Sequence, residues 1–140
     1  MEDHERTLKL RVKRCTRKSA GLVLSCGAFV PAGLVLAVDS SFLAIPYGIA
    51  TLTAAAYHWS EEKAFVAVDH GCAYSVIAAN LWMLLHASSV AGAMGAASLI
   101  LLGLACYARA HESDYSRFHS AWHLLAGAGG LVLALTYRHG

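Results

Sequence analysis

Residues 70–108 read HGCAYSVIAANLWMLLHASSVAGAMGAASLILLGLACYA, a run of 39 residues without one Asp, Glu, Lys or Arg. A helix needs only about 20 apolar residues to cross the hydrocarbon core of a bilayer. The run is therefore too long for one span, and the polar break His86-Ala87-Ser88-Ser89 is the natural turn within it. It predicts two transmembrane helices joined by a short loop, at about 64–85 and 90–109.

The rest of the chain follows the same pattern. Of its 140 residues, 57% are hydrophobic and 14% are charged, whereas soluble domains carry roughly 25% charged residues. Further apolar stretches predict spans at about 20–38, 41–59 and 119–137. The composition excludes disordered and collagen-like chains. A nucleic-acid partner is disfavoured because most basic residues lie in one arm, 1–19. We expect an all-α, polytopic membrane helix bundle of about five transmembrane helices within residues 20–140.

Basic residues decide the orientation that we expect for this bundle. Seven of the 11 Lys and Arg residues lie in the N-terminal arm, at Arg6, Lys9, Arg11, Lys13, Arg14, Arg17 and Lys18. With five spans and a cytoplasmic N-terminus, Lys63, Arg109 and Arg117 join them, which makes ten basic residues on the inner side. Arg138 alone remains outside, so the positive-inside rule predicts a multi-pass protein with a cytoplasmic N-terminus. A cleaved signal peptide over 1–38 is disfavoured, because the apolar run is too long and no clear cleavage site follows.

Five ionisable residues lie within or at the ends of the expected spans, namely His58, Asp69, His70, His119 and His123. Such residues are costly in a bilayer and usually face the bundle interior or a water-filled cavity. The alternating directions of the helices place all five toward the cytoplasmic side. Any one histidine at a helix end can equally reach toward water at the interface. We favour that interpretation for His70, which is turned about 100° around the helix from Asp69, and for His86 at the opposite side.

His119 and His123 are four positions apart, which places them on one helix face about one turn apart. Two imidazoles at this spacing can bind one metal ion, and His58 can supply a third ligand from a neighbouring helix. Three protein ligands and an open fourth position are typical of a catalytic zinc site. Asp69 can take the proton of a water at such a metal, or orient a ligand imidazole. Its structural alternative is a buried carboxylate paired with Lys63. We favour a functional role for Asp69, because burying an isolated carboxylate in a membrane costs free energy.

Other features favour packing over chemistry. No CxxC spacing links the four cysteines, which lie mostly in apolar spans: Cys15, Cys26, Cys72 and Cys106. We expect small buried side chains there rather than a disulfide framework. Glycine-rich faces in the last two spans predict close helix packing and leave a homo-oligomer open. Pro31 and Pro46 lie inside spans and predict kinks, which membrane bundles tolerate.

The order of these motifs resembles a known membrane family. Tyr57-His58, then Asp69 early in the next helix, then HSAWH at 119–123 are similar to the superfamily of alkaline ceramidases, adiponectin and progestin receptors, and GPI-processing membrane hydrolases. The HSxWH stretch and the preceding YH look most like the branch with myomaker and the GPI-phospholipase-like proteins. The family pattern has seven helices, and a serine four residues before its first histidine, where this chain has Ala54.

The resemblance implies a site and an activity. It implies that His58, His119 and His123 bind zinc near the cytoplasmic side. It also implies that Asp69 is the acid/base or water-positioning residue in hydrolysis of a lipid amide or ester bond. The leading hypothesis is therefore a zinc-dependent integral-membrane hydrolase, with Zn²⁺ as cofactor and a membrane lipid as substrate that enters sideways from the bilayer.

Two other functions remain open from the sequence. One is a b-type haem or quinone-binding membrane anchor, since small helical bundles can ligate haem between helices. Axial haem ligands should face each other from two helices, however, whereas His119 and His123 share one helix face. The other is a non-catalytic protein in which the metal only joins the helices, and the absence of the family serine at Ala54 favours it.

Overall fold

The computed structural model describes residues 20–39, 41–60, 62–110 and 112–137. Within these ranges the chain is helical and forms no strand, which confirms the predicted all-α bundle. The basic arm expected over 1–19, on which the predicted orientation mostly depends, lies outside the described residues.

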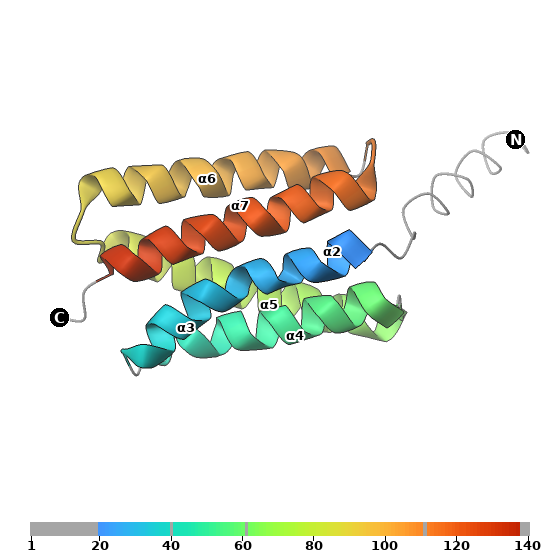
Figure 1. The fold of residues 1–140 in the computed structure, drawn as a ribbon, viewed down its shortest axis with the longest axis horizontal. Helices are drawn as coiled ribbons and strands as arrows, with labels where there is room; N and C mark the ends of the chain where they lie inside the picture. The colour runs from blue at the N-terminus through green and yellow to red at the C-terminus, as the bar shows by residue number, and fades with distance from the viewer. Residues whose placement is uncertain (1–19, 40, 61, 111, 138–140) are drawn as a thin grey trace, which may run out of the picture.

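Five helical rods make up the described part of the chain (Figure 1). The first rod is continuous and consists of α2 (Ala20–Ser25), a 3₁₀ turn η1 (Cys26–Phe29) and α3 (Val30–Val38). The others are α4 (Ala44–Ser60), α5 (Lys63–Leu85), α6 (Val90–Ala110) and α7 (Tyr115–Thr136). All five predicted spans are therefore helical.

Helix α7 begins earlier than the predicted start at 119. Asp114 caps it, because its carboxylate accepts a hydrogen bond from the backbone N–H of Arg117 at 3.2 Å. Asp at this position is a favoured N-cap, since it satisfies one of the N–H groups that the first turn leaves unpaired. His119 and His123 consequently lie in the second and third turns of α7, inside the bundle rather than at its rim.

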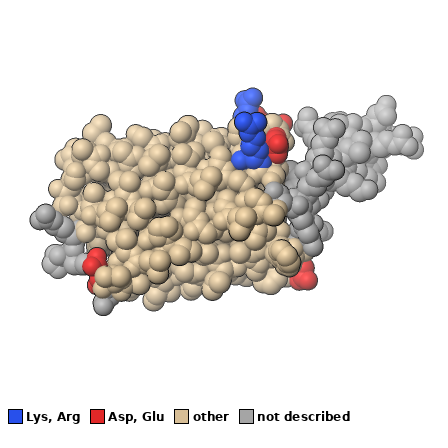
Figure 2. Space-filling view, in the orientation of Figure 1, with Lys and Arg blue, Asp and Glu red and all other residues tan. Residues whose placement is uncertain are grey.

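Four of the described rods are long and apolar enough to cross a bilayer: Ala20–Val38, Ala64–Leu85, Val90–Ala110 and Tyr115–Thr136. Helix α4, with 17 residues, is at the short end of the range of about 17–25 residues for a span. On the face shown in Figure 2, charged side chains gather at the two ends of the bundle and leave the middle uncharged. The described chain therefore has the make-up of a multi-pass membrane protein.

Helix α7 lies at the centre of the bundle, between α6 and the first rod (Figure 1). Its contact with α6 depends on glycine, because a Cβ at Gly129 would lie 2.7 Å from Cγ1 of Ile100 and 3.1 Å from the carbonyl oxygen of Ala96. Small residues let helix backbones approach closely in membrane bundles. Helix α5 packs mainly on α4, touches α7 lightly and makes next to no contact with α6 among the described residues. A space therefore remains on the α5 side of the α6–α7 pair.

The two prolines have different effects. Pro31 has no N–H to donate to the helix, and its ring would clash with the backbone carbonyl of the residue four positions earlier. The chain before it tightens into η1, where the N–H of Val30 bonds to the carbonyl of Gly27. Pro46 lies in the first turn of α4, where its missing N–H has no helical partner to lose. No kink is required there, because α4 begins at Ala44 rather than near 41.

Candidate metal centre

His58, His119 and His123 come together at one end of the bundle. His58 stands in the last turn of α4, and the other two lie on α7. The ring centroid of His58 is 5.0 Å from that of His119 and 5.4 Å from that of His123. The ring centroids of His119 and His123 are 4.7 Å apart. All three side chains are buried, with exposed fractions of 4–7%. Imidazoles packed this closely away from water are not interfacial side chains.

A fourth member of this cluster comes from the first rod. Cys26 is fully buried, and its Sγ lies 3.7 Å from Nδ1 of His123. One ligand atom each from Cys26, His58 and His123 lie within 4.8 Å of one another. Around a tetrahedral zinc, with Zn–S near 2.3 Å and Zn–N near 2.0 Å, sulfur and nitrogen ligands stand about 3.5 Å apart. The three atoms are therefore gathered at nearly the spacing that one ion requires.

The imidazole of His58 supplies a second observation in favour of a metal site. Its Nε2 is buried and has no hydrogen-bond partner among the described residues. Leaving a buried polar atom unsatisfied costs about 1–3 kcal/mol. An imidazole nitrogen beside a thiol and another imidazole is the donor set that zinc takes in proteins. The residues present therefore fit a bound metal ion.

Ser25 orients the imidazole of His123. Its hydroxyl donates to the carbonyl of Leu22 at 2.7 Å, and the same Oγ lies 2.9 Å from Nδ1 of His123. If the hydroxyl proton is donated to Leu22, the oxygen is free to accept the Nδ1–H of His123. That tautomer would leave the lone pair of His123 on Nε2. Outer hydrogen bonds of this kind fix the tautomer and ring orientation of metal-ligating histidines.

Gly127 sets the distance between the first rod and α7. A Cβ at Gly127 would lie 2.7 Å from the carbonyl carbon of Ala28 and 2.9 Å from its Cβ. The turn η1 can therefore rest directly on the backbone of α7, one helical turn beyond His123. This contact brings Cys26 next to the histidines.

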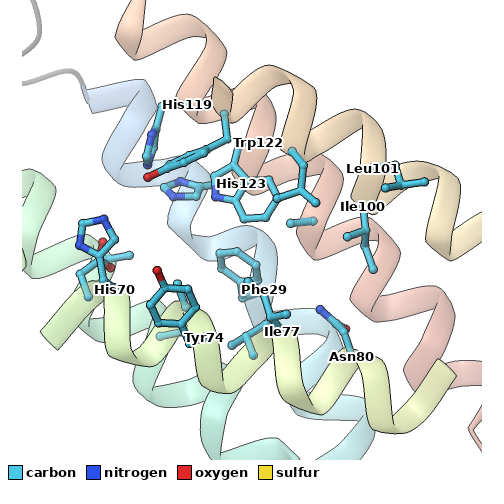
Figure 3. A pocket seen from close by; sticks show the side chains of 18 of the residues that line it. Phe29, His70, Tyr74, Ile77, Asn80, Ile100, Leu101, His119, Trp122 and His123 are labelled. Atoms are coloured by element: carbon cyan, nitrogen blue, oxygen red, sulfur yellow. The ribbon is translucent and has the colours of Figure 1, made fainter. Parts of the chain in front are cut away.

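A cavity of about 660 Å³ opens from the histidine cluster on the α5 side of α6 and α7 (Figure 3). Its volume is within the range of about 300–1,000 Å³ that is common for ligand pockets. His119 and His123 line one end, and most of the remaining wall is apolar. The cavity joins the candidate metal centre to the apolar interior between helices.

Asp69 and His70 lie on the α5 wall of this cavity. Asp69 is half-buried. His70 is exposed, and its Nδ1 lies 2.8 Å from the carbonyl oxygen of Val66 on its own helix. The structure thus places Asp69 on the wall of the cavity that His119 and His123 also line, and its predicted role there stays a prediction.

The sequence alone missed Ser25 and Cys26. Cys26, Cys72 and Cys106 are free thiols, so the expectation of no disulfide holds for the described cysteines. Cys26 is buried as predicted, but its sulfur is also one of the three gathered ligand atoms, which was not predicted from the sequence. The signal available in the sequence was Pro31, which lies five residues after Cys26 and indicates an irregularity in the helix there.

Comparisons with protein-family models, with curated proteins and with solved structures find no match to this chain. The family resemblance of the histidine and aspartate motifs, and the assignment of His58, His119 and His123 as the ligand set, therefore stay predictions. The structure itself supports a bundle of membrane-like helices with a buried Cys/His cluster that could hold a metal ion.

Proposed function

We propose that this protein is a zinc-dependent integral-membrane hydrolase that cleaves a lipid amide or ester bond. One observation carries the proposal: a buried cluster of Cys26, His58, His119 and His123 forms the polar end of a largely apolar cavity, with Asp69 on its wall. A lipid tail can enter from the bilayer between α5 and α6, where the two helices make little contact. Its polar linkage then lies beside the metal centre.

The residues divide into metal ligands and a proton acceptor. His58 and His123 bind the ion, with Cys26 or His119 as the third ligand. Zinc bound there supplies a Lewis acid for the scissile carbonyl and lowers the pKa of a water molecule toward about 7. Asp69 receives the proton from the attacking water at its carboxylate oxygen, and later returns it to the leaving group.

Ser25 supports the ligand His123 in this proposal. The related family has a serine four residues before its first histidine, where this chain has Ala54. The hydroxyl of Ser25 reaches the cluster from the first rod instead, at 2.9 Å from Nδ1 of His123. We place the centre toward the cytoplasmic side, because the distribution of basic residues favours a cytoplasmic N-terminus.

Metal content is the first test. Wild-type protein purified in detergent should contain about one zinc per chain by elemental mass spectrometry, and His58→Ala and His123→Ala should not retain it. His86→Ala is the matched control, because His86 is an exposed histidine at the opposite end of the bundle. Wild-type protein without stoichiometric metal would overturn the proposal, and a Soret band would assign the cluster to haem.

Turnover is the second test. Asp69→Asn should bind zinc normally and hydrolyse a panel of ceramides and glycerophospholipids about 10²–10⁴-fold more slowly, since that is the usual contribution of general acid–base catalysis. Equal rates for wild type and Asp69→Asn would remove Asp69 from the chemistry.

A second function is favoured by one feature of the cluster. Cys26, His58 and His123 come from three different rods, so a metal bound by them would also join those rods. Zinc that stabilises the fold, in a protein without turnover on any lipid of the panel, would identify a purely structural metal.

A further inference from the structure

A second polar group lies far from the metal centre, in the apolar part of the cavity. Asn80 on α5 lines the cavity and is only 6% exposed. Its carboxamide oxygen accepts a hydrogen bond from the hydroxyl of Tyr47 on α4 at 2.5 Å. Asn80 makes no other side-chain hydrogen bond within the described ranges, so its amide nitrogen has no partner there. Figure 3 shows this nitrogen on the cavity side of the side chain.

Tyr47 fixes the direction of the Asn80 amide. The tyrosine is fully buried, and its hydroxyl packs so closely on α7 that a Cβ at Gly130 would lie 2.9 Å from it. Because this hydroxyl is bonded to the amide oxygen, the amide nitrogen is the atom that Asn80 presents to the cavity (Figure 3). Polar groups within a protein are normally hydrogen-bonded. A ligand atom that accepts a hydrogen bond would provide the missing partner.

The position of Asn80 says where that atom lies on the ligand. Asn80 follows Asp69 by 11 residues on α5, and its partner Tyr47 precedes the candidate ligand His58 by 11 residues on α4. Either separation is about 16 Å along the helix. An extended chain advances about 1.2 Å per bond, so this distance corresponds to roughly 13 bonds. The cavity wall between these residues is mostly apolar, and it continues past Asn80 to Leu84 and Leu133.

We propose that the lipid bound here carries an oxygen on its acyl chain, roughly a dozen bonds from the group at the metal centre, and that Asn80 donates a hydrogen bond to it. The substrate class is thus an oxygenated acyl lipid, with a hydroxyl or keto group near carbon 12. This assignment rests on the proposed function, which supplies the anchor at the metal end. Asn80 determines specificity and takes no part in the reaction.

Non-hydrolysable probes separate this proposal from the proposed function. Zinc-loaded protein in nanodiscs is offered equal amounts of stearate and 12-hydroxystearate, or stearate and 12-oxostearate, and bound fatty acid is measured by native mass spectrometry. Both oxygenated probes should bind about three- to tenfold more tightly than stearate, as one added hydrogen bond provides. The keto probe can only accept, so its preference identifies the protein group as a donor.

Two variants and one positional isomer complete the test. Asn80→Leu should lose the preference while it still binds stearate, and Tyr47→Phe should weaken it by freeing the amide to rotate. 3-Hydroxystearate should gain nothing over stearate in wild-type protein, and this comparison stands even where a variant fails to fold. Equal binding of stearate and 12-hydroxystearate, or an equal gain from the 3-hydroxyl, would overturn the proposal. Fatty-acid preference without lipid hydrolysis would overturn only the proposed function.

Discussion

The two ends of the bundle use histidine in opposite ways. At the metal end, His58, His119 and His123 are buried against one another. At the other end, His86 is exposed and stacks on Trp82 with ring centroids 4.3 Å apart. His58 and His86 both stand at the ends of apolar helices, so sequence position alone does not separate these two. The separation comes from whether a neighbouring backbone approaches closely enough to exclude water.

The two ends also differ in the hydrogen bonds that join neighbouring helices. At the end away from the candidate metal centre, the loop between α5 and α6 is bonded to the end of α7, because the N–H and Oγ of Ser88 donate to the carbonyl of Thr136 at 2.8 and 2.7 Å. Nε1 of Trp82 also donates to the hydroxyl of Tyr137 at 3.2 Å. At the end with the candidate metal centre, α5 and α6 make next to no contact in the described part of the chain. One end therefore closes the bundle, and the other leaves it open to a ligand.

The largest expected effect is at the metal end. Cys26→Ser should weaken zinc binding by at least about a hundredfold, because removing a ligand exceeds the 10–100-fold cost of losing an outer-shell partner. Cys72→Ser is the matched control, since Cys72 is a half-buried free thiol on α5 outside the gathered ligand atoms. Competition with a chromophoric zinc chelator measures both affinities. If Cys26→Ser leaves the zinc affinity unchanged and His119→Ala lowers it, the third ligand is His119 rather than Cys26.

A smaller effect is expected where the first rod rests on α7. Gly127→Ala should destabilise the protein by about 1–3 kcal/mol, as overpacking does, and should reduce zinc retention by moving η1 away from His123. Gly95→Ala is the control, because a Cβ at Gly95 meets nothing within 4 Å. It should be neutral or stabilising by up to about 1 kcal/mol. Thermal unfolding in detergent, with and without chelator, tests the pair. Equal stability of the two variants would contradict the close contact.

The smallest effect is expected at the closed end. Ser88→Ala should destabilise the bundle by about 0.5–1.5 kcal/mol, the net value of a hydrogen bond, and should leave zinc affinity unchanged. Ser98→Ala is the comparison, because Ser98 bonds only to the carbonyl of Met94 on its own helix. Denaturant titration in mixed micelles measures the difference. A loss of zinc from Ser88→Ala would mean that the two ends are coupled.

The helices and part of the site could be predicted from local sequence. Long charge-free runs, divided at the polar break 86–89, predict the helices, and the spacing of His119 and His123 places them on one face wherever the helix lies. The prediction that His58 and Asp69 lie toward the same end of the bundle followed from the alternating directions of the helices. The start of α7 was placed too late, because the cap at Asp114 was not recognised.

Cys26 and Asn80 could not be predicted in this way. Cys26 is 97 residues from His123, and the face of the first rod that meets α7 depends on the 3₁₀ turn and on the contact with Gly127. Asn80 is one polar residue in an apolar helix until its pairing with Tyr47 fixes the direction of its amide. Both depend on contacts between rods, which spacing within one helix does not encode.

The candidate ligands are spread from the first described rod to the last. Cys26 belongs to η1 and His123 to α7, and chains leave the ribosome from the N-terminus onward. Until α7 has been synthesised, only Cys26 and His58 of the three gathered side chains exist together. If the cluster binds zinc as proposed, these two alone would hold it poorly, and metal uptake would be a late event in biosynthesis. Retained metal would then mark the chains whose last helix has docked.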